Sequence, residues 1–328
     1  MNKRDFILIW AERGAISDAP AALGLAGVLP SVREWRLFLD RLLLWCGAVA
    51  LAAAVVFFVA HNWNELGRYA KFGLLELLVV AAVAGYWRLG PDRASGKASL
   101  VAASILLGAL LAFFGQTYQT GADTWELFAT WFALMLPWVI IGRFAGLWML
   151  SIVIANTASA LYFQAFPGLL GMVFNTERQL WTLFAFNTAC LVAWELAARR
   201  IAWLNERWAP RLLLFAGGLL VTALAIQGIF RWDFRGSEQS GAALLIHPLW
   251  LVCLYAAYRH WRRDLFAIAG ACLSAIVVVT AFLSKHLLAG RAAEANFLFI
   301  GAIVIVMAAA AGWWLKQIAS EEGAQHAD

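Results

Sequence analysis

Ten long runs of apolar residues fill the chain between residues 42 and 315, and they constrain its fold more than any other feature. Three of these runs hold no charged residue over 19 to 21 positions: 42–60, 212–230 and 295–315. A helix needs about 20 apolar residues to cross the hydrocarbon core of a bilayer. The composition, 63% hydrophobic and 14% charged, is too apolar for a water-soluble fold, which usually has about 45–50% and 25%. The sequence therefore indicates an integral membrane protein.

These runs are continuously apolar and lack the alternating pattern of a membrane β-barrel strand. In lipid, such a segment satisfies its own backbone hydrogen bonds only as a helix. We therefore predict an all-α fold, a polytopic transmembrane helical bundle of about ten spans. The expected spans are 43–60, 70–87, 99–116, 125–141, 145–163, 180–198, 212–230, 241–258, 265–284 and 295–315. Glu76 interrupts the second span, and Pro137 lies within the fourth.

The distribution of basic residues predicts the orientation of the spans. The N-terminal segment and alternate loops together carry 18 of the 25 Lys and Arg residues. Cytoplasmic loops are enriched in Lys and Arg. We therefore expect both termini to be cytoplasmic.

The first 41 residues carry too many charges for a signal peptide and are expected to form a small cytoplasmic cap of amphipathic helices. Gly14 suits the end of the first of these helices. Ser31 and Glu34 have the spacing of a capping box, ahead of a helix that we expect to continue into the first span. Two interpretations remain open for residues 1–41: a segment that lies on the inner leaflet, or a docking domain for a protein partner.

The expected domain organisation has four parts. These are the cytoplasmic cap at 1–41, a first membrane half at 42–163, a second membrane half at 164–316 and a cytoplasmic tail at 317–328. Spans three and seven end similarly, with LLAFFGQ at 110–116 and LVTALAIQG at 220–228. This echo is compatible with parallel repeats, as in some transporters, and also with chance similarity between apolar helices.

Several kinds of chemistry find no support in the sequence. The four cysteines lie in separate apolar runs without C-x-x-C or Cys/His spacing, so we expect neither a structural disulfide nor a metal site. The G-x-S-x-G, H-E-x-x-H and phosphate-loop motifs are absent, so we expect no cofactor, and an enzyme is the less favoured class. The cysteines are Cys46, Cys190, Cys253 and Cys272.

The net charge of +5 follows from the asymmetry of the loops and does not indicate nucleic-acid binding. Four arginines cluster between residues 199 and 211, at an expected inner membrane surface. We expect them to meet anionic headgroups, which makes membrane lipids the expected partners. The four are Arg199, Arg200, Arg207 and Arg211.

The most unusual local chemistry lies near the expected outer ends of the first four spans. Polar residues follow the first span, end the third and open the fourth, and a carboxylate interrupts the second. Such positions could together line a polar vestibule. The candidate binding residues are Asn62, Trp63, Glu65, Glu76, Gln116, Tyr118 and Asp123.

Glu76 lies about two turns inside the second span, where a charged group costs about 2.5–3.5 kcal/mol at a helix centre. If the helix begins near Glu65, an 11-residue separation brings Glu76 back within about 20° of the same direction, on a stripe that could face Gln116 and Tyr118. One interpretation is a water-filled vestibule in which Glu76 titrates or binds a cation. The other is a structural hydrogen bond from Glu76 to Lys71, Gln116 or a backbone carbonyl.

His247 and Pro248 lie in the middle of the eighth span. Proline frees a backbone carbonyl, and the histidine could satisfy that carbonyl or relay protons. We interpret the pair as structural.

Three stretches of the first half of the chain carry a resemblance to a known family. They are the amphipathic segment 16–29, AHNWNEL at 60–66 and GQTYQTGADTWEL at 115–127. Over about residues 5–150 the chain resembles the bacterial predicted membrane proteins grouped as domain of unknown function 2157. The resemblance implies a polytopic protein of the bacterial inner membrane without an established reaction. It also includes the polar residues that end spans one and three.

Three functions compete. The first is transport-type handling of a small solute, ion or lipid through the polar vestibule near spans one to four, which predicts a solvated cavity. The second is a non-catalytic membrane subunit that docks a partner, which predicts tightly packed spans and an exposed apolar patch. The third is an intramembrane enzyme that uses Glu76 or His247, which predicts converging titratable side chains. Transport is the preferred interpretation.

Overall fold

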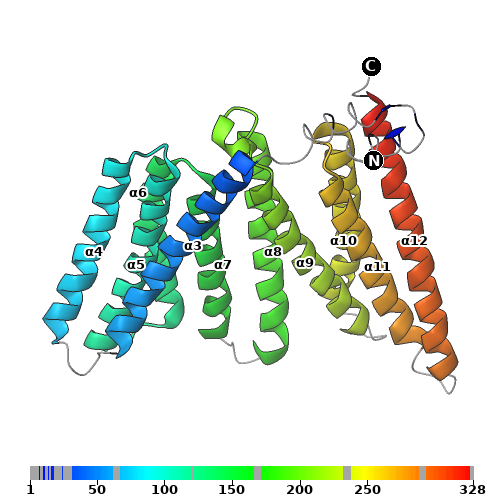
Figure 1. Cartoon of the computed structure of the whole chain (residues 1–328). Coiled ribbons are helices and arrows are strands. Elements are labelled where there is room, and N and C mark those ends of the chain that lie inside the picture. The colour runs from blue at the N-terminus through cyan, green and yellow to red at the C-terminus, as the bar shows by residue number, and fades with distance from the viewer. Residues whose placement is uncertain are drawn as a thin grey trace. The chain divides into compact units, whose positions relative to one another are not determined.

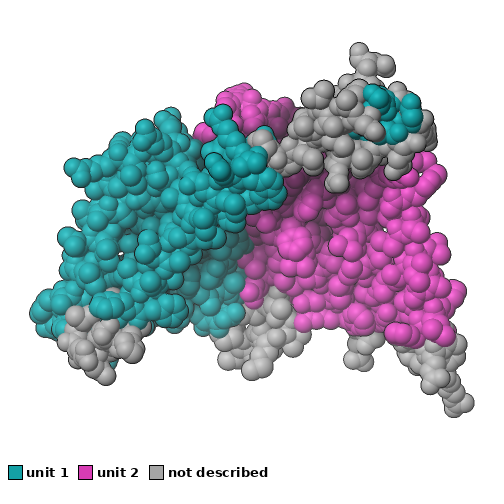
Figure 2. Space-filling model, viewed as in Figure 1, with its two compact units in different colours: residues 1–165 teal, residues 166–328 magenta. Residues whose placement is uncertain are grey.

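The structure is a computed structural model of the whole chain. It describes residues 32–61, 67–119, 121–165, 171–231, 238–287 and 293–325, together with Ile7, Trp10, Ala11, Gly14, Ile16, Ser17 and Gly24. The chain divides into two compact units, residues 1–165 and 166–328, which are shown in different colours in Figure 2. Each unit is described by itself.

The described residues of unit 1 form five long helices (Figure 1). They are α3 (Val32–His61), α4 (Arg68–Leu89), α5 (Ala94–Tyr118), α6 (Thr124–Gly142) and α7 (Ala145–Ala165). Helix α5 packs against α3, α4 and α6, and α7 packs against α6. Because α5 has neighbours on three sides, it is the most buried span of this unit.

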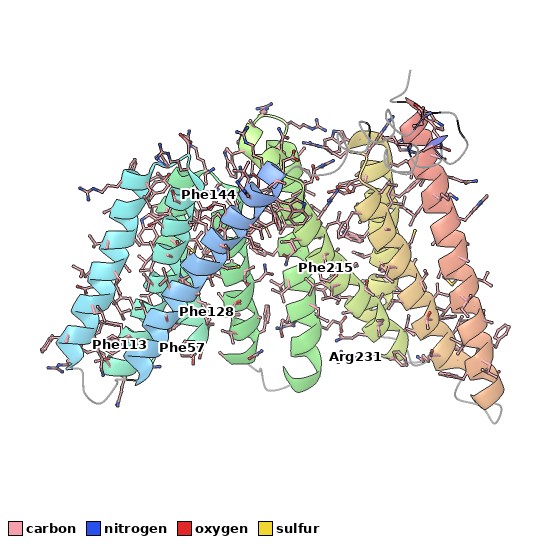
Figure 3. The ribbon with its side chains drawn as sticks, in the orientation of Figure 1. Phe57, Phe113, Phe128, Phe144, Phe215 and Arg231 are labelled. Atoms are coloured by element: carbon pink, nitrogen blue, oxygen red, sulfur yellow. The ribbon has the colours of Figure 1, made fainter. Side chains whose placement is uncertain are left out.

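The core of unit 1 depends on small residues in α5. A Cβ atom at Gly108 would lie 2.5 Å from the Trp131 ring of α6, so only glycine lets the indole lie flat on the helix. The same indole donates a hydrogen bond from Nε1 to the Ser104 carbonyl at 2.8 Å. Phe113 lies toward one end of the unit and Phe144 at the other (Figure 3).

Unit 2 also contains five long helices, with two short helical segments between them (Figure 1). The elements are α8 (Gly171–Ala197), the 3₁₀ segment η1 (Ala202–Asn205), α9 (Trp208–Arg231), α10 (Glu238–Ala256), the π-helical segment η2 (Ala257–Trp261), α11 (Leu265–Leu287) and α12 (Ala293–Gln325). Helix α9 packs against α8, α10 and α11, and α12 packs against α11. Helix α9 is thus the central span of unit 2.

The predicted all-α class and the predicted ten spans are confirmed. In the described part of the chain all regular structure is helical, and 10 helices are long and apolar enough to cross a membrane. Many of their outward side chains are large and apolar, for example Leu77, Val252 and Leu298. A surface of this kind is compatible with lipid rather than with water.

The helix before the first span does continue into it, since α3 is unbroken from Val32 to His61. The cap predicted at residues 1–41 lies mostly outside the described residues. Within it, Gly14 has a φ of +67° and its N–H donates to the Ala11 carbonyl at 3.0 Å. This is the left-handed geometry expected where a helix ends.

Candidate functional site

A hollow of about 660 Å³ lies between the end of α5 and the start of α6 in unit 1. Two left-handed residues reverse the chain here: Gln119 (φ 44°) directly after α5, and Gly121 (φ 66°). Asp123 is then extended (φ −66°, ψ 152°) and precedes the first turn of α6. This tight connection brings Gln116 and Asp123 to the lining of one space, which we call the polar hollow.

The polar hollow combines an apolar wall with polar and acidic side chains. The Asp123 side chain forms no capping hydrogen bond to α6, although the Glu126 N–H donates to the Asp123 carbonyl at 3.0 Å. The side chains of Asp123 and Glu126 both line the hollow, and no Lys or Arg is among the described lining residues. The described lining is therefore acidic. Its lining is Leu111, Ala112, Phe114, Gly115, Gln116, Gln119, Gly121, Ala122, Asp123, Thr124, Glu126, Leu127 and Thr130.

Tyr118 lies on another side of α5. Its ring is 5.9 Å from the Phe72 ring of α4 and 4.8 Å from the Phe114 ring, between centroids. It does not line the polar hollow. Tyr118 is therefore part of an aromatic contact between α4 and α5.

Glu76 is not in the polar hollow either. It is exposed, on the outward stripe of α4 that also carries Tyr69, Leu77 and Val80. The α5-facing stripe carries Lys71 and Leu75 instead. Five residues in a helix correspond to about 140°, so Lys71 and Glu76 point in different directions. The structure thus does not bring Glu76 together with Gln116, Tyr118 or Asp123.

Lys71 is a buried charged residue that the sequence interpretation considered only as a partner for Glu76. It is 5% exposed, and its Nζ lies 5.9 Å from the centroid of the Phe113 ring. Its i, i+4 spacing with Leu75 places both on the helix face that packs against α5. That spacing was the available signal, but an end-of-helix lysine usually extends its amine toward water.

Three of the candidate binding residues, Asn62, Trp63 and Glu65, lie outside the described residues. Of the other four, Gln116 and Asp123 share the polar hollow, whereas Glu76 and Tyr118 lie elsewhere. Among the residues that the structure describes, no three His, Cys, Asp or Glu side chains gather as metal ligands. The four cysteines are free thiols.

Unit 2 holds a charged network that sequence reasoning missed. Glu195 of α8 is 8% exposed and accepts a hydrogen bond from the Tyr258 hydroxyl at 2.9 Å. The guanidinium groups of Arg207 and Arg262 lie 3.4 and 3.2 Å from its two oxygens. Arg262 also donates to the Glu195 carbonyl at 3.2 Å, and Arg207 donates to the Arg262 carbonyl. We call these four residues the Glu195 network.

A second ion pair lies close by in the chain. Arg211 of α9 binds both carboxylate oxygens of Asp264 at 3.1 Å, and Asp264 accepts from the Phe266 N–H at 3.1 Å to cap α11. Arg207 and Arg211, two of the arginines expected to meet lipid headgroups, each pair with a buried carboxylate. Their contact with lipid stays a prediction. Their partners are up to 55 residues distant in sequence, so no local pattern pointed to them.

His247 links three helices of unit 2. Its Nε2 lies 2.9 Å from the Ser274 hydroxyl of α11, which lies 2.6 Å from the Thr222 hydroxyl of α9. Thr222 in turn donates to the Gly218 carbonyl at 2.6 Å. These bonds tie α10, α11 and α9 together, as polar side chains do between membrane helices.

The ten apolar helices among the described residues, each of spanning length, characterise a multi-pass α-helical membrane protein. Residues 9–148 match the model of a family described as "Predicted membrane protein (DUF2157)". The chain therefore carries a DUF2157 region, and the resemblance drawn from its sequence motifs is confirmed. No curated protein and no solved structure matches the chain.

Proposed function

We propose that the protein handles a small polar or cationic solute at the membrane, and that the polar hollow is where the solute enters. The supporting observation is the hollow itself, about 660 Å³ in volume, lined by the carboxylates of Asp123 and Glu126 and the amide of Gln116. Carboxylate and amide oxygens together bind cations and polar hydrogens. Apolar residues on the other wall exclude bulk water from one side of a bound solute.

The hollow extends along α6 and is not confined to the loop between α5 and α6. Its lining reaches Thr130, six residues into α6, which corresponds to about two turns of helix. A packed helix interface at that depth would be dry. A solute pathway requires water there.

Thiol accessibility in intact cells tests this requirement. In a variant without the four native cysteines, Thr130→Cys should react with membrane-impermeant methanethiosulfonates about as fast as Asp123→Cys. Ala133→Cys, which is exposed one turn further along α6 but does not line the hollow, is the matched control and should remain slow. Equal rates for Thr130→Cys and Ala133→Cys would contradict the proposal.

The charge of the hollow gives a second test. At Gln116→Cys a cationic methanethiosulfonate should react faster than an anionic one by about tenfold, because an acidic cleft concentrates cations. Asp123→Asn with Glu126→Gln should abolish that preference. Tyr118→Cys, on the other side of α5, should show little preference in either background. If the cationic reagent still reacted faster after both carboxylates were removed, Asp123 and Glu126 would not be the source of the preference.

A second candidate function, a membrane subunit that docks a partner helix, is favoured by Glu76. This carboxylate is exposed beside Leu77, between Tyr69 and Val80 on an apolar stripe, where contact with lipid is costly. A partner helix with a hydrogen-bond donor at that depth would remove the cost. A photo-crosslinker at Leu77 should then capture one membrane protein in cells, and Glu76→Leu should weaken the capture. A crosslinker at Leu134, exposed on α6, is the control.

A further inference from the structure

Unit 2 contains a pocket of about 210 Å³ between α8 and α10 that none of the preceding functions uses. Its walls are apolar along most of their length, with Leu191 and Val192 from α8 and Cys253 and Leu254 from α10. At one end, Glu195, Tyr258 and Arg262 make the pocket polar. The complete lining is Thr188, Leu191, Val192, Glu195, Leu196, Trp250, Cys253, Leu254, Ala257, Tyr258, Trp261 and Arg262.

Two local features create this pocket. Trp250 packs on α9 where two glycines allow close approach: a Cβ at Gly218 would be 3.3 Å from the indole. Helix α10 then changes to the π-helical segment η2, in which the Arg262 N–H donates to the Ala257 carbonyl, five residues back, at 3.1 Å. Such π segments occur frequently at functional sites. Here it directs Tyr258 toward Glu195 and leaves Trp261 at the end of the pocket.

The polar end carries an excess of positive charge. Glu195 is one carboxylate shared by two guanidinium groups, those of Arg207 and Arg262. Arg199 adds a third, stacked 3.7 Å above the Trp261 ring that lines the pocket. Asp264 also acts on Tyr258, and it is paired with Arg211. Around this end, four guanidinium groups therefore face two carboxylates, and the excess of positive charge favours an anion.

The rest of the pocket favours a hydrocarbon chain. Its walls offer apolar surface, whose burial against a chain is favourable. Val192 and Leu196, which line it, are also exposed on the outer surface of α8. The pocket thus opens on an apolar helix face, from which a membrane lipid could enter sideways.

We propose that this pocket binds an anionic phospholipid, with an acyl chain between α8 and α10 and the phosphate beside Arg262 and Arg199. The site is independent of the polar hollow, which lies in the other unit. A free phosphate would use only the arginines, and a zwitterionic lipid would bring a second cation to a site that is already positive.

Binding to the purified full-length protein tests the class of ligand. By native mass spectrometry from detergent, phosphatidylglycerol should bind about fivefold more tightly than phosphatidylcholine, because its headgroup carries a net negative charge and no choline cation. Inorganic phosphate should neither bind nor compete. Equal binding of the two lipids, or competition by phosphate alone, would overturn the proposal.

Matched variants locate the bound lipid. Val192→Trp fills the pocket, whereas Val252→Trp adds the same bulk to an exposed position of α10 outside it. Arg199→Gln removes the cation stacked on the indole, whereas Arg200→Gln removes its exposed neighbour. The first member of each pair should weaken phosphatidylglycerol binding about fivefold, and the second should leave it unchanged. Equal effects within both pairs would show that the lipid lies elsewhere.

A native thiol gives a readout that needs no variant. Cys253 lines the pocket, and Cys46 is exposed in unit 1. Phosphatidylglycerol should slow the reaction of Cys253 with a bulky maleimide and leave Cys46 unaffected, as judged by peptide mass analysis. Unaltered labelling of Cys253 at saturating lipid would contradict the site.

Discussion

Glu195 and Glu76 are both carboxylates within long apolar helices, and their surroundings are opposite. Glu195 is buried and receives three side-chain partners, whereas Glu76 is exposed among apolar neighbours. A buried charge persists in a fold only when it is paired. Glu195 is therefore paired within unit 2, whereas Glu76 lies on the exposed face of α4.

Replacement of Glu195 by Gln should strongly destabilise the protein. The change keeps the shape of the side chain but leaves Arg207 and Arg262 without their shared counter-charge. Loss of one partner from such a pair costs about 3 kcal/mol, at the low end of the usual range because the guanidinium groups are partly exposed. The free energy of unfolding in mixed detergent and SDS micelles measures this loss.

The control for that measurement is Glu206→Gln. Glu206 accepts a hydrogen bond from the Trp208 indole at 2.7 Å on the surface. Its replacement should change the free energy of unfolding by about 0.5 kcal/mol or less. A similar loss for Glu195→Gln and Glu206→Gln would show that the Glu195 network contributes little to stability.

Site residues were foreseeable only where the contacts are local. Gln116 and Asp123 come together because they are only seven positions apart, on either side of the tight turn between α5 and α6, and their polarity amid apolar runs marked them in the sequence. Glu195 meets Tyr258 across 63 residues and Arg262 across 67. Contacts at that separation depend on how α8, α9 and η2 pack, which hydropathy alone does not reveal.

At the scale of the helices, the spans were predictable because lipid permits few alternatives to a helix. The residues at which the helices begin and end were less predictable. Helix α8 begins at Gly171, before the expected span at 180–198, and its Glu177 pairs with Arg231 of α9 at 3.5 Å. Helix α12 continues to Gln325, past the expected end at 315, and Glu321 pairs with Arg259. The expected spans were drawn to end at charged residues. In the structure α8 and α12 extend past these limits, and their charged residues there form ion pairs with other helical segments.

The packing of α5 on α6 gives a prediction for one glycine. Gly108→Ala should destabilise unit 1 by about 1–3 kcal/mol, because the added methyl group would overlap the Trp131 ring and force the helices apart. Gly115→Ala, in the same helix with nothing within 4 Å of its Cβ position, should be neutral or stabilising by up to about 1 kcal/mol. Thermal unfolding of both variants in detergent separates the two cases. Equal melting temperatures would show that Trp131 repacks without cost.

For the molecule as a whole, the echo between residues 110–116 and 220–228 falls on the central helix of each unit. These residues end α5 and α9, each of which is the most buried span of its unit and has three neighbouring helices. Helix α5 is the third long helix of its unit and α9 is the second. The two segments therefore lie on the central helix of each unit, but these helices do not hold equivalent places in the helix order.

The ten spans make a prediction about which loops face the cytoplasm. If the 18 Lys and Arg residues on one side set the orientation, the loop at Pro91 between α4 and α5 is cytoplasmic, and the loop at Gly121 between α5 and α6 is on the opposite side. A phosphatase reporter, active only outside the cytoplasm, should be active when fused after Gly121 and inactive after Pro91 or Asp328. A cytoplasmic fluorescent reporter should show the reverse.

Because α5 crosses the membrane between the first two fusion points, equal activity at Pro91 and Gly121 would contradict the assignment of α5 as a span. Opposite activities with the signs exchanged would keep the ten spans and invert the protein, which would place the polar hollow on the cytoplasmic side.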